Sequence, residues 1–445
     1  MSGAPVLPMN LCLYLSSAVT VPTGWFVLGV AALALLLAFF FAGLFGPMPR
    51  YEMRDREQIP PNDTNPFLLL LSSLVDAAIN RSGRLNVFTN GPAFYPAILD
   101  AFRSAQRSIN LEAYVFLKSE IARQYVEVLA ERARAGVQVN LNLDAFGSLG
   151  APDKVFAPLL QAGGKVVRYN RLTWYHLMRM DNRTHRELVI IDGNHAFIGG
   201  AGVADQWFTG AGGKPRWRDT MIHVEGEAVA NLQATFMENW LQAADELLVG
   251  NAYFPDIQCP DPTTALVINS TPTAGGSTRA RILMQLLIAS AKSHVAITTP
   301  YFLPDKTLRR ELCRAVERGV KLQILVPGMK SDHMVTRSTS RGAYGELLKA
   351  GAEVYEYQPS MIHAKILIID ELWAVVGSTN FDNRSFGIND EVNLAVRDPD
   401  VARRLASDFT NDLRESQRIT IEDWHHRPLT ERCTELLGWA IERQQ

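Results

Sequence analysis

The strongest hydrophobic pattern lies near the start of the chain, where no charged side chain occurs between Met1 and Arg50. Within it, the segment from Trp25 to Phe45 is almost wholly apolar. At about 1.5 Å per residue, a helix of this length crosses a hydrocarbon core of about 30 Å. We therefore predict a membrane anchor over residues 1–49, with one transmembrane pass, or two if Pro5 to Val21 forms another helix.

The charges around this anchor predict its orientation. Arg50, Arg54 and Arg56 follow the apolar run, and no basic residue precedes it. The positive-inside rule then places the rest of the chain in the cytoplasm. A cleaved signal peptide is less favoured, because the run has no basic region before it and no clear cleavage site after it.

Beyond the anchor, amphipathic helices alternate with short apolar strands. Helices expected at Ile121 to Ala135 and Leu308 to Glu317 carry apolar residues at intervals of three to four and stop at Gly136 and Gly319. The strands lack a clean alternation of apolar and polar residues, which is typical of a sheet covered by helices on both faces. The pattern predicts an α/β fold.

The helix and strand pattern occurs twice, and the two copies share short matching segments in the same order. The matches pair Ser104–Gln106 with Ser290–Lys292, Tyr114 with Tyr301, Ala135–Val139 with Arg318–Leu322, and Leu159–Gly163 with Leu347–Gly351. Two unrelated α/β domains would not keep this order. We predict two tandem domains related by a pseudo-twofold axis.

Stretches rich in proline and asparagine predict the boundaries. One runs from Gln58 to Pro66 and another from about Asn251 to Thr273. The predicted organisation is an anchor at 1–49, a linker at 50–66, a first domain at 67–255 and a second at 256–445. We refer to the last two as the first half and the second half.

Composition excludes some partners. Forty-four basic and 46 acidic residues give a net charge of −2, which provides no basic footprint for nucleic acid. Cys12, Cys259, Cys313 and Cys433 show neither disulfide nor zinc spacing, so a reducing compartment is the simplest interpretation.

The candidate chemistry lies in a pair of matching histidine motifs. The first half contains His185, followed by Glu187 and Asp192, and the second contains His363, followed by Lys365 and Asp370. Each motif runs along an apolar strand, and small residues follow it, Gly199-Gly200 in one copy and Gly377-Ser378 in the other. A histidine duplicated in matched surroundings indicates two imidazoles that face one phosphorus atom.

Such a pair can transfer a phosphoryl-linked group. A neutral imidazole can attack a phosphodiester, and a second imidazole can protonate the leaving alcohol and then deprotonate the incoming one. Residues two apart on a strand share a face, so Lys365 lies beside His363. Lys365, Asn380 and Ser378 are expected to bind the non-bridging oxygens. The sequence contains no evident metal cluster, and this chemistry needs no cofactor.

Carboxylates are expected to hold the histidines in place. Glu391 begins a strand 28 residues after His363, and Asp219 begins the equivalent strand of the first half. We predict that each orients the histidine of its own half, although strand-start caps at the surface are the alternative. Asp192 and Asp370 are counted among the candidate catalytic residues, with a structural role at the strand end as the competing interpretation.

These motifs resemble those of the phospholipase D superfamily, and within it the bacterial cardiolipin synthases. The resemblance extends from about residue 80 to the end and is strongest in Ser340–Gly345, Tyr355–Pro359, Met361–Lys365, Gly377–Phe386, Asn389–Glu391 and Trp424–Pro428. It implies tandem phospholipase D-type α/β sandwich domains and a cytoplasmic body anchored to the bacterial inner membrane. It also implies transfer of a phosphatidyl group from one phosphatidylglycerol to another, through a phosphatidyl-histidine intermediate on His185, with His363 as the general acid and base.

Two positions of the first half depart from this family. Glu187 stands where a lysine is expected, and Gly202 stands where the second half has Asn380. A carboxylate about 4 Å from a phosphoryl oxygen costs about 4 kcal/mol at an effective dielectric near 20. Glu187 is therefore expected to pair with Arg183, to turn aside and contact the hydroxyls of the acceptor, or to mark a degraded first half.

Three functions follow from these alternatives. The favoured one is a membrane-anchored phosphatidyltransferase that makes cardiolipin, and the others are a phospholipase D-type hydrolase and a catalytically impaired lipid-binding protein. Trp207 and Trp217 are expected either in a lipid groove or in the core. The remaining histidines, among them His195 and His333, belong to no predicted site.

Overall fold

The computed structural model describes residues 23–45, 52–171, 181–210, 212–213, 216–257, 259, 263–272, 279–428 and 431. The chain divides into two compact units, Met1–Met48 and Pro49–Gln445.

The first unit contains the helix α1 (Thr23–Phe45). Its side chains are described as far as residue 38, and they are exposed. In the part of the chain that the structure describes, no helix meets the length and apolarity required of a membrane span. The second pass considered for Pro5 to Val21 lies outside the described residues.

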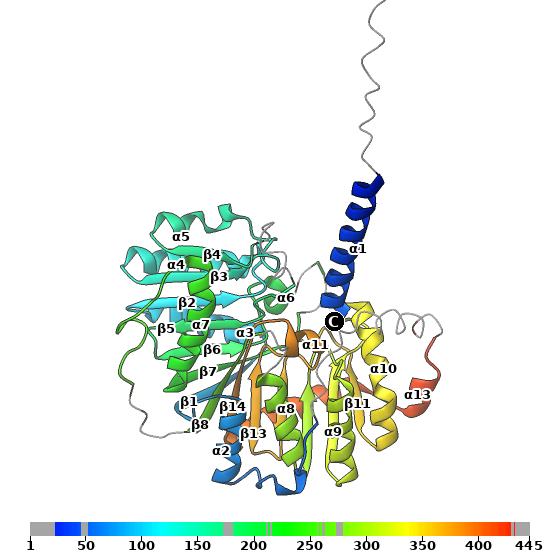
Figure 1. Cartoon of the computed structure of the whole chain (residues 1–445). Coiled ribbons are helices and arrows are strands. Elements are labelled where there is room, and N and C mark those ends of the chain that lie inside the picture. Colours follow the sequence, from blue (N-terminus) through cyan, green and yellow to red (C-terminus); the bar gives the residue numbers. More distant parts are fainter. Residues whose placement is uncertain are drawn as a thin grey trace, which may run out of the picture. The chain divides into compact units, whose positions relative to one another are not determined.

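The second unit is built on one mixed sheet of 15 strands (Figure 1). In spatial order these are β15 (Ser416–Ile419), β11 (Glu353–Tyr357), β10 (Lys321–Pro327), β9 (His294–Thr298), β12 (Ile366–Ile369), β13 (Trp373–Gly377), β14 (Glu391–Arg397), β8 (Thr263–Ser270), β1 (Asn80–Thr89), β7 (Thr220–Gly226), β6 (His195–Gly199), β5 (Glu187–Ile191), β2 (Ser108–Ala113), β3 (Gln138–Asp144) and β4 (Lys165–Tyr169).

The order of the strands repeats outward from the central antiparallel pair β1–β8. On one side follow β7, β6, β5, β2, β3 and β4, and on the other β14, β13, β12, β9, β10 and β11, with β15 added at the edge. In both halves the outermost of these strands are parallel and the inner ones antiparallel. The chain thus forms a mixed α/β fold, and its sheet continues through both predicted domains.

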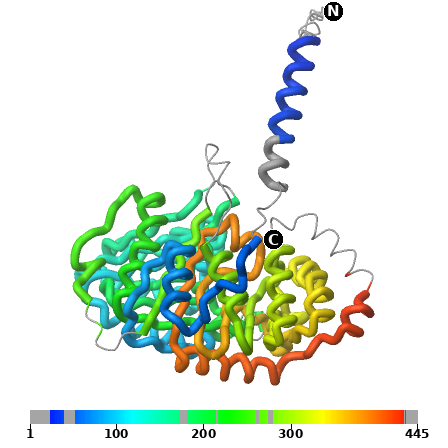
Figure 2. The backbone as a smooth tube through the Cα atoms, turned by 60° about the horizontal axis from the view of Figure 1, so that its bottom comes forward, coloured from blue at the N-terminus to red at the C-terminus, as the bar shows by residue number. Residues whose placement is uncertain are grey.

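Helices and strands enclose three apolar cores. The first half packs α3 (Gly91–Ser104), α4 (Glu120–Arg134), α5 (Ala157–Gln161) and α6 (Asp205–Phe208) on one face of its strands. The second half does the same with α8 (Arg279–Ser290), α9 (Lys306–Glu317) and α10 (Met334–Ala350). The third core lies between the halves and contains α7 (Ala228–Ala244) and α12 (Pro399–Arg414). Figure 2 shows the halves side by side.

The segment predicted as a linker packs on the second half instead. Its residues are described from residue 52, and they include the short 3₁₀ helix η1 (Arg56–Gln58). Arg56 Nε lies 3.0 Å from the buried Glu311, and Asn62 donates to Asp370 at 2.6 Å. A buried carboxylate needs such a partner, which explains why this segment is ordered against the sheet.

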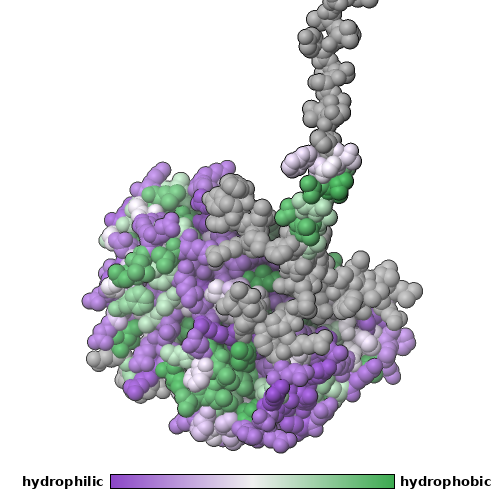
Figure 3. Space-filling model, viewed as in Figure 1, coloured by the Kyte–Doolittle hydropathy of each residue, from purple (hydrophilic) through white to green (hydrophobic). Residues whose placement is uncertain are grey.

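The first domain was predicted to begin at residue 67, but the segment that starts there packs on the second half. The helix α2 (Asn65–Leu74) places Phe67, Leu68 and Leu71 in the core of the second half rather than the first. Its other face is exposed at Leu69 and Leu74, and Figure 3 shows a hydrophobic area at this level of the surface.

Candidate active site

His185 and His363 occupy corresponding places, immediately before β5 and β12. Each is fixed by a short parallel bridge to the other half. His185 N donates to Asp390 O at 2.9 Å, and Asp390 N donates to Arg183 O at 2.8 Å. In the second bridge, His363 N donates to Arg218 O at 2.7 Å, and Arg218 N donates to Met361 O at 2.8 Å.

These bridges pair each histidine with the carboxylate of the opposite half. His185 Nδ1 lies 3.1 Å from Oε1 of Glu391, and His363 Nδ1 lies 3.0 Å from Oδ2 of Asp219. The predicted pairing within each half is therefore wrong. Within a half, the histidine strand and the carboxylate strand are separated by a third strand, which puts them about 10 Å apart. Both carboxylates are fully buried, so the alternative of a surface cap is also excluded.

The surroundings of His185 determine its tautomer. Nδ1 faces the carbonyl oxygen of Ser378 at 3.1 Å as well as the Glu391 carboxylate. A carbonyl oxygen can only accept a hydrogen bond, so Nδ1 carries the proton. The Nε2 atom then keeps its lone pair free for attack on an electrophile.

His363 lies in a more strongly charged environment. Nζ of Lys365 is 2.7 Å from its Nδ1 and 2.7 Å from its carbonyl oxygen. Burial and the charge of Lys365 lower the pKa of His363, against the hydrogen bond with Asp219. Burial also raises the pKa of Asp219, but its bond to His363 and the charge of Lys365 outweigh this and hold that pKa below its usual range.

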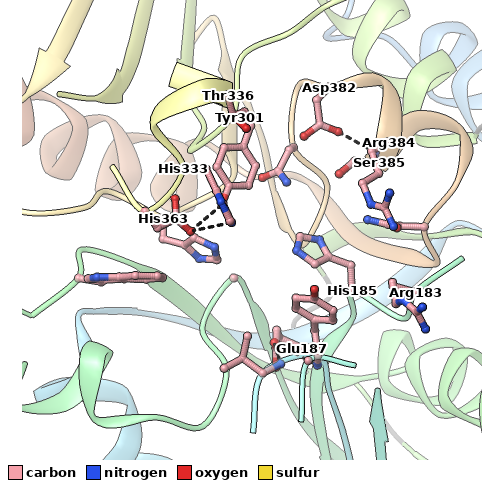
Figure 4. Close-up of a pocket in the computed structure, with 18 of the residues that line it drawn as sticks. Arg183, His185, Glu187, Tyr301, His333, Thr336, His363, Asp382, Arg384 and Ser385 are labelled. Atoms are coloured by element: carbon pink, nitrogen blue, oxygen red, sulfur yellow. Dashed lines mark hydrogen bonds and ion pairs between the residues drawn. The ribbon is translucent and has the colours of Figure 1, made fainter. Parts of the chain in front are cut away.

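Both rings border one cavity of about 540 Å³ (Figure 4). Second-half residues give it a polar wall: Asn380 Oδ1 and Asn389 Oδ1 are buried there without a hydrogen-bond partner among the described residues. Burial lowers the pKa of Lys365 to about 8. The two amide oxygens accept hydrogen bonds and so suit a hydroxyl group, whereas an anionic oxygen needs donors such as the amide nitrogen of Asn380 or the ammonium group of Lys365. Behind this wall, the hydroxyl group of Ser378 donates a hydrogen bond to Glu391.

The first half contributes an aromatic wall. Tyr114, Trp207 and Trp217 line the cavity together with Arg183, which is buried, and Phe146, which is exposed. Both tryptophans considered for a lipid groove therefore border the cavity, and Trp207 also donates from Nε1 to Asp219 at 3.0 Å.

Several lining residues were missed in the sequence. They are Tyr114, Tyr301, Asp332, His333, Asp382 and Arg384. The two tyrosines occupy matching positions in the repeat, and this signal could have identified them. His333 was assigned to no site because it lies in the loop before α10, far in sequence from either motif.

Glu187 turns away from the polar wall of the cavity. Its Oε1 accepts the backbone N–H groups of Tyr114 and Val115, both at 3.2 Å. The expected pair with Arg183 is not formed, and Arg183 instead lies over the ring of Phe146. Burial raises the pKa of Glu187 well above its usual range, so the neutral carboxylic acid is favoured.

Gly202 explains how Glu187 fits. A Cβ atom at Gly202 would come within 3.1 Å of Glu187 Oε1 and 2.5 Å of the Val115 carbonyl oxygen. The glutamate carboxyl thus occupies the space beside the position that corresponds to Asn380. The two departures from the family pattern form one structural unit.

Asp192 and Asp370 lie away from the cavity, so counting them as catalytic was wrong. Each follows its strand with φ at 54° and accepts backbone N–H groups at the start of a neighbouring strand. Asp192 accepts from Gln106, Arg107 and Ser108, and Asp370 from Lys292, Ser293 and His294. These contacts support the competing structural interpretation.

Comparisons with known proteins agree with this geometry. Residues 284–413 match the family model described as "Cardiolipin synthase, PLD-like domain". The chain is 33% identical over 360 residues to the probable cardiolipin synthase YwiE of Bacillus subtilis (strain 168), covering 80% of this chain and 71% of that protein. It is also 33% identical over 376 residues to the major cardiolipin synthase ClsA of the same organism, covering 83% and 76%.

A solved structure supports the fold. The chain resembles the phosphatidylserine synthase of Haemophilus influenzae Rd KW20 with a TM-score of 0.62 at 15% identity, covering 84% of this chain and 97% of that one. Together, the repeated histidine motifs, the shared cavity and the extent of the sequence identity place this chain in the cardiolipin synthase family of the phospholipase D superfamily.

Proposed function

We propose that this protein is a membrane-anchored phosphatidyltransferase that makes cardiolipin from two molecules of phosphatidylglycerol through a phosphatidyl-histidine intermediate. The observation that carries the proposal is the pair of histidines on one cavity, each with Nδ1 held by a buried carboxylate. We assign the two sets of strands to two phospholipase D-type repeats related by a pseudo-twofold axis.

In the first half-reaction, Nε2 of His185 attacks the phosphorus of one phosphatidylglycerol. The bond from phosphorus to the glycerol oxygen breaks, and His363 gives that oxygen a proton. Burial and Lys365 lower the pKa of His363 and disfavour its protonated form. The negative charge of the bound phosphodiester acts in the opposite direction and favours the protonated form. The products are phosphatidyl-His185 and free glycerol.

In the second half-reaction, the glycerol hydroxyl of another phosphatidylglycerol takes the place of the leaving group. His363 removes its proton, the oxygen attacks phosphorus, and the bond to His185 breaks. Cardiolipin and the free enzyme result. One phosphodiester replaces another, so the reaction needs no nucleotide and no cofactor.

The second half supplies the phosphate-binding groups. The Asn380 side chain, which lines the cavity, and the Lys365 ammonium, whose Nζ lies 3.0 Å from Nε2 of His363, bind the non-bridging oxygens. Ser378 positions Glu391. At an effective dielectric near 20, an ammonium about 4 Å from a phosphoryl oxygen contributes about 4 kcal/mol.

The first half supplies the acceptor side. Glu187 borders the cavity as a neutral acid, and a neutral carboxyl can exchange hydrogen bonds with a hydroxyl without repelling the phosphate. Glu187 thus contacts the glycerol hydroxyls of the acceptor lipid, and Arg183, which also lines the cavity, contacts the phosphate of that lipid.

The apolar run Trp25–Phe45 anchors the protein in the bacterial inner membrane with its catalytic body in the cytoplasm. Phosphatidylglycerol carries two acyl chains and stays in the bilayer, so an enzyme held at the membrane meets its substrate by diffusion in two dimensions. Phe146, exposed in the loop after β3, borders the cavity, and Leu149 is exposed in the same loop, so this loop is suited to contact acyl chains.

Labelled phosphatidylglycerol given to the purified, detergent-solubilised protein tests this function. Cardiolipin with an equal amount of glycerol is expected. Phosphatidic acid would indicate a hydrolase, and no turnover a lipid-binding protein. His185→Ala and His363→Ala should each abolish turnover, while a chain lacking residues 1–48 should leave the membrane fraction and retain activity on solubilised lipid.

A further inference from the structure

We propose that His195, His223 and Glu225 form a binding site for a divalent transition-metal ion such as Zn²⁺, separate from the catalytic cavity. This inference goes beyond the proposed function, and it holds whether or not the protein makes cardiolipin.

The sheet register brings the three side chains together. Glu225 of β7 lies directly opposite His195 of β6, and His223 lies two residues before Glu225. Residues two apart on a strand point to the same face, and so do directly opposed partners. All three side chains therefore project from one face of adjacent strands.

The distances fit a small ion. Nδ1 of His195 is 3.7 Å from Oε1 of Glu225, and Nδ1 of His223 is 3.9 Å from the same oxygen. One ligand atom from each residue lies within 4.8 Å of the others. In a tetrahedral zinc site with ligands at about 2.0–2.1 Å, the ligand atoms are about 3.4 Å apart. Closing this difference takes small side-chain rotations.

The charges at the site also fit, because two imidazoles and one carboxylate offer neutral and anionic ligand atoms to a divalent ion. The carboxylate of Glu225 supplies negative charge, and the positive charge of the nearby Arg84 partly offsets it.

The site is open to solvent on one side. The side chains of His195 and Glu225 are 41% and 35% exposed, whereas that of His223 is 14% exposed. An ion can therefore enter without unfolding of the sheet. Two imidazoles and a carboxylate suit Zn²⁺ and similar ions, whereas Mg²⁺ and Ca²⁺ prefer oxygen ligands alone.

The location excludes a role at phosphorus. His195 begins β6, and Gly200 borders the catalytic cavity just past the other end of this strand. The separation along the strand is about 15 Å. A bound ion would join β6 to β7 and stabilise the first half.

Calorimetric titration of Zn²⁺ into the tag-free, chelator-treated full-length protein tests the proposal. We expect one saturable site per chain, a higher melting temperature with Zn²⁺, and no response to Mg²⁺. His195→Ala and His223→Ala should each weaken binding at least tenfold. The matched control His426→Ala, which changes an exposed histidine elsewhere, should bind as the unaltered chain does.

A second comparison separates this site from the catalytic histidines. His185→Ala should keep the full Zn²⁺ affinity. The proposal is overturned if the intact chain shows no saturable binding, if His195→Ala and His223→Ala bind normally, or if binding disappears in His185→Ala. Because the side chain of His195 is 41% exposed, the metal-free melting temperature of His195→Ala should stay close to that of the unaltered chain, which excludes misfolding as the cause.

Discussion

The carboxyl group of Glu187 stands where the family resemblance implies a lysine, and its contacts show why it is tolerated. It is held by two backbone N–H groups, lies against Gly202, and is favoured in its neutral form. A neutral acid does not repel the phosphate as a carboxylate does. The two halves of the site are therefore chemically different, because a lysine accompanies His363 whereas a neutral acid accompanies His185.

Substitution of Glu187 distinguishes a working residue from a degraded one. Glu187→Gln keeps the acceptor oxygen and should retain stability and most activity. Glu187→Ala leaves the N–H groups of Tyr114 and Val115 unpaired and should lower the free energy of unfolding by about 1–3 kcal/mol. Glu187→Lys directs an ammonium group at the same two donors and should lose activity; a gain in rate would instead show that the first half is a decayed lysine site.

The raised pKa of Glu187 gives this comparison a pH dependence. A group whose folded pKa is above its unfolded value stabilises the protein at low pH, and this contribution is lost as the pH rises through the folded pKa. The unaltered chain should therefore lose stability relative to Glu187→Gln as the pH rises above the usual glutamate range. Melting temperatures of both chains across the pH range measure the difference.

Lys365 predicts the alkaline limb of the pH profile. Burial lowers its pKa to about 8, and in the proposed mechanism only the charged form binds the non-bridging oxygens. The kcat/KM value, which reports the free enzyme, should fall above about pH 8. In Lys365→Arg the charge persists at all accessible pH values, so whatever activity remains should lose this limb. An unchanged limb would assign it to another group.

At the scale of the elements, Asp192 and Asp370 hold the turns after the histidine strands against the starts of β2 and β9. Each collects three backbone N–H groups that would otherwise remain without partners. The histidine strand is thereby fixed at the end opposite the cavity. Rigid placement of the imidazoles depends on these turns, although neither aspartate contacts the cavity.

Asp370→Ala should therefore destabilise the fold without removing the chemistry. Loss of the shared acceptor should lower the free energy of unfolding by about 1–3 kcal/mol for the unpaired N–H groups, with turnover retained at a temperature where the chain is folded. Asp370→Asn is the matched control, because asparagine tolerates the left-handed φ of 54° and keeps one acceptor oxygen. Equal loss of turnover in both variants would contradict the structural role.

At the scale of the whole molecule, the halves complete each other's site. His185 is held by Glu391, 206 residues away in sequence, and His363 by Asp219, 144 residues away, through the two bridges between the halves. The apolar core between the halves keeps these segments in register.

Double-mutant cycles on thermal unfolding test this crossed pairing. Alanine substitutions should show a coupling energy on the order of 1 kcal/mol for His185 with Glu391 and for His363 with Asp219. The uncrossed combinations, His185 with Asp219 and His363 with Glu391, serve as controls and should be additive. Coupling found only in the uncrossed combinations would refute the arrangement.

The sequence predicted the features that are local or repeated. The two histidine motifs, the α/β pattern and the order of elements follow from periodicity and from matching segments. The crossed pairs could not be predicted, because they depend on which strand ends meet when the halves pack. The same is true of His195, His223 and Glu225, which only the strand register unites, and of Glu187, whose backbone partners lie more than 70 residues away.

The reciprocal bridges have a consequence for recombining enzymes of this family. A chimera that joins the first half of one synthase to the second half of another replaces both histidine–carboxylate contacts in a single step, and neither parental contact survives. Functional hybrids should therefore be obtained where the two parents have similar residues in the bridges around Asp219 and Asp390. In a library of chimeras, the similarity of these bridges should predict activity better than overall sequence identity does.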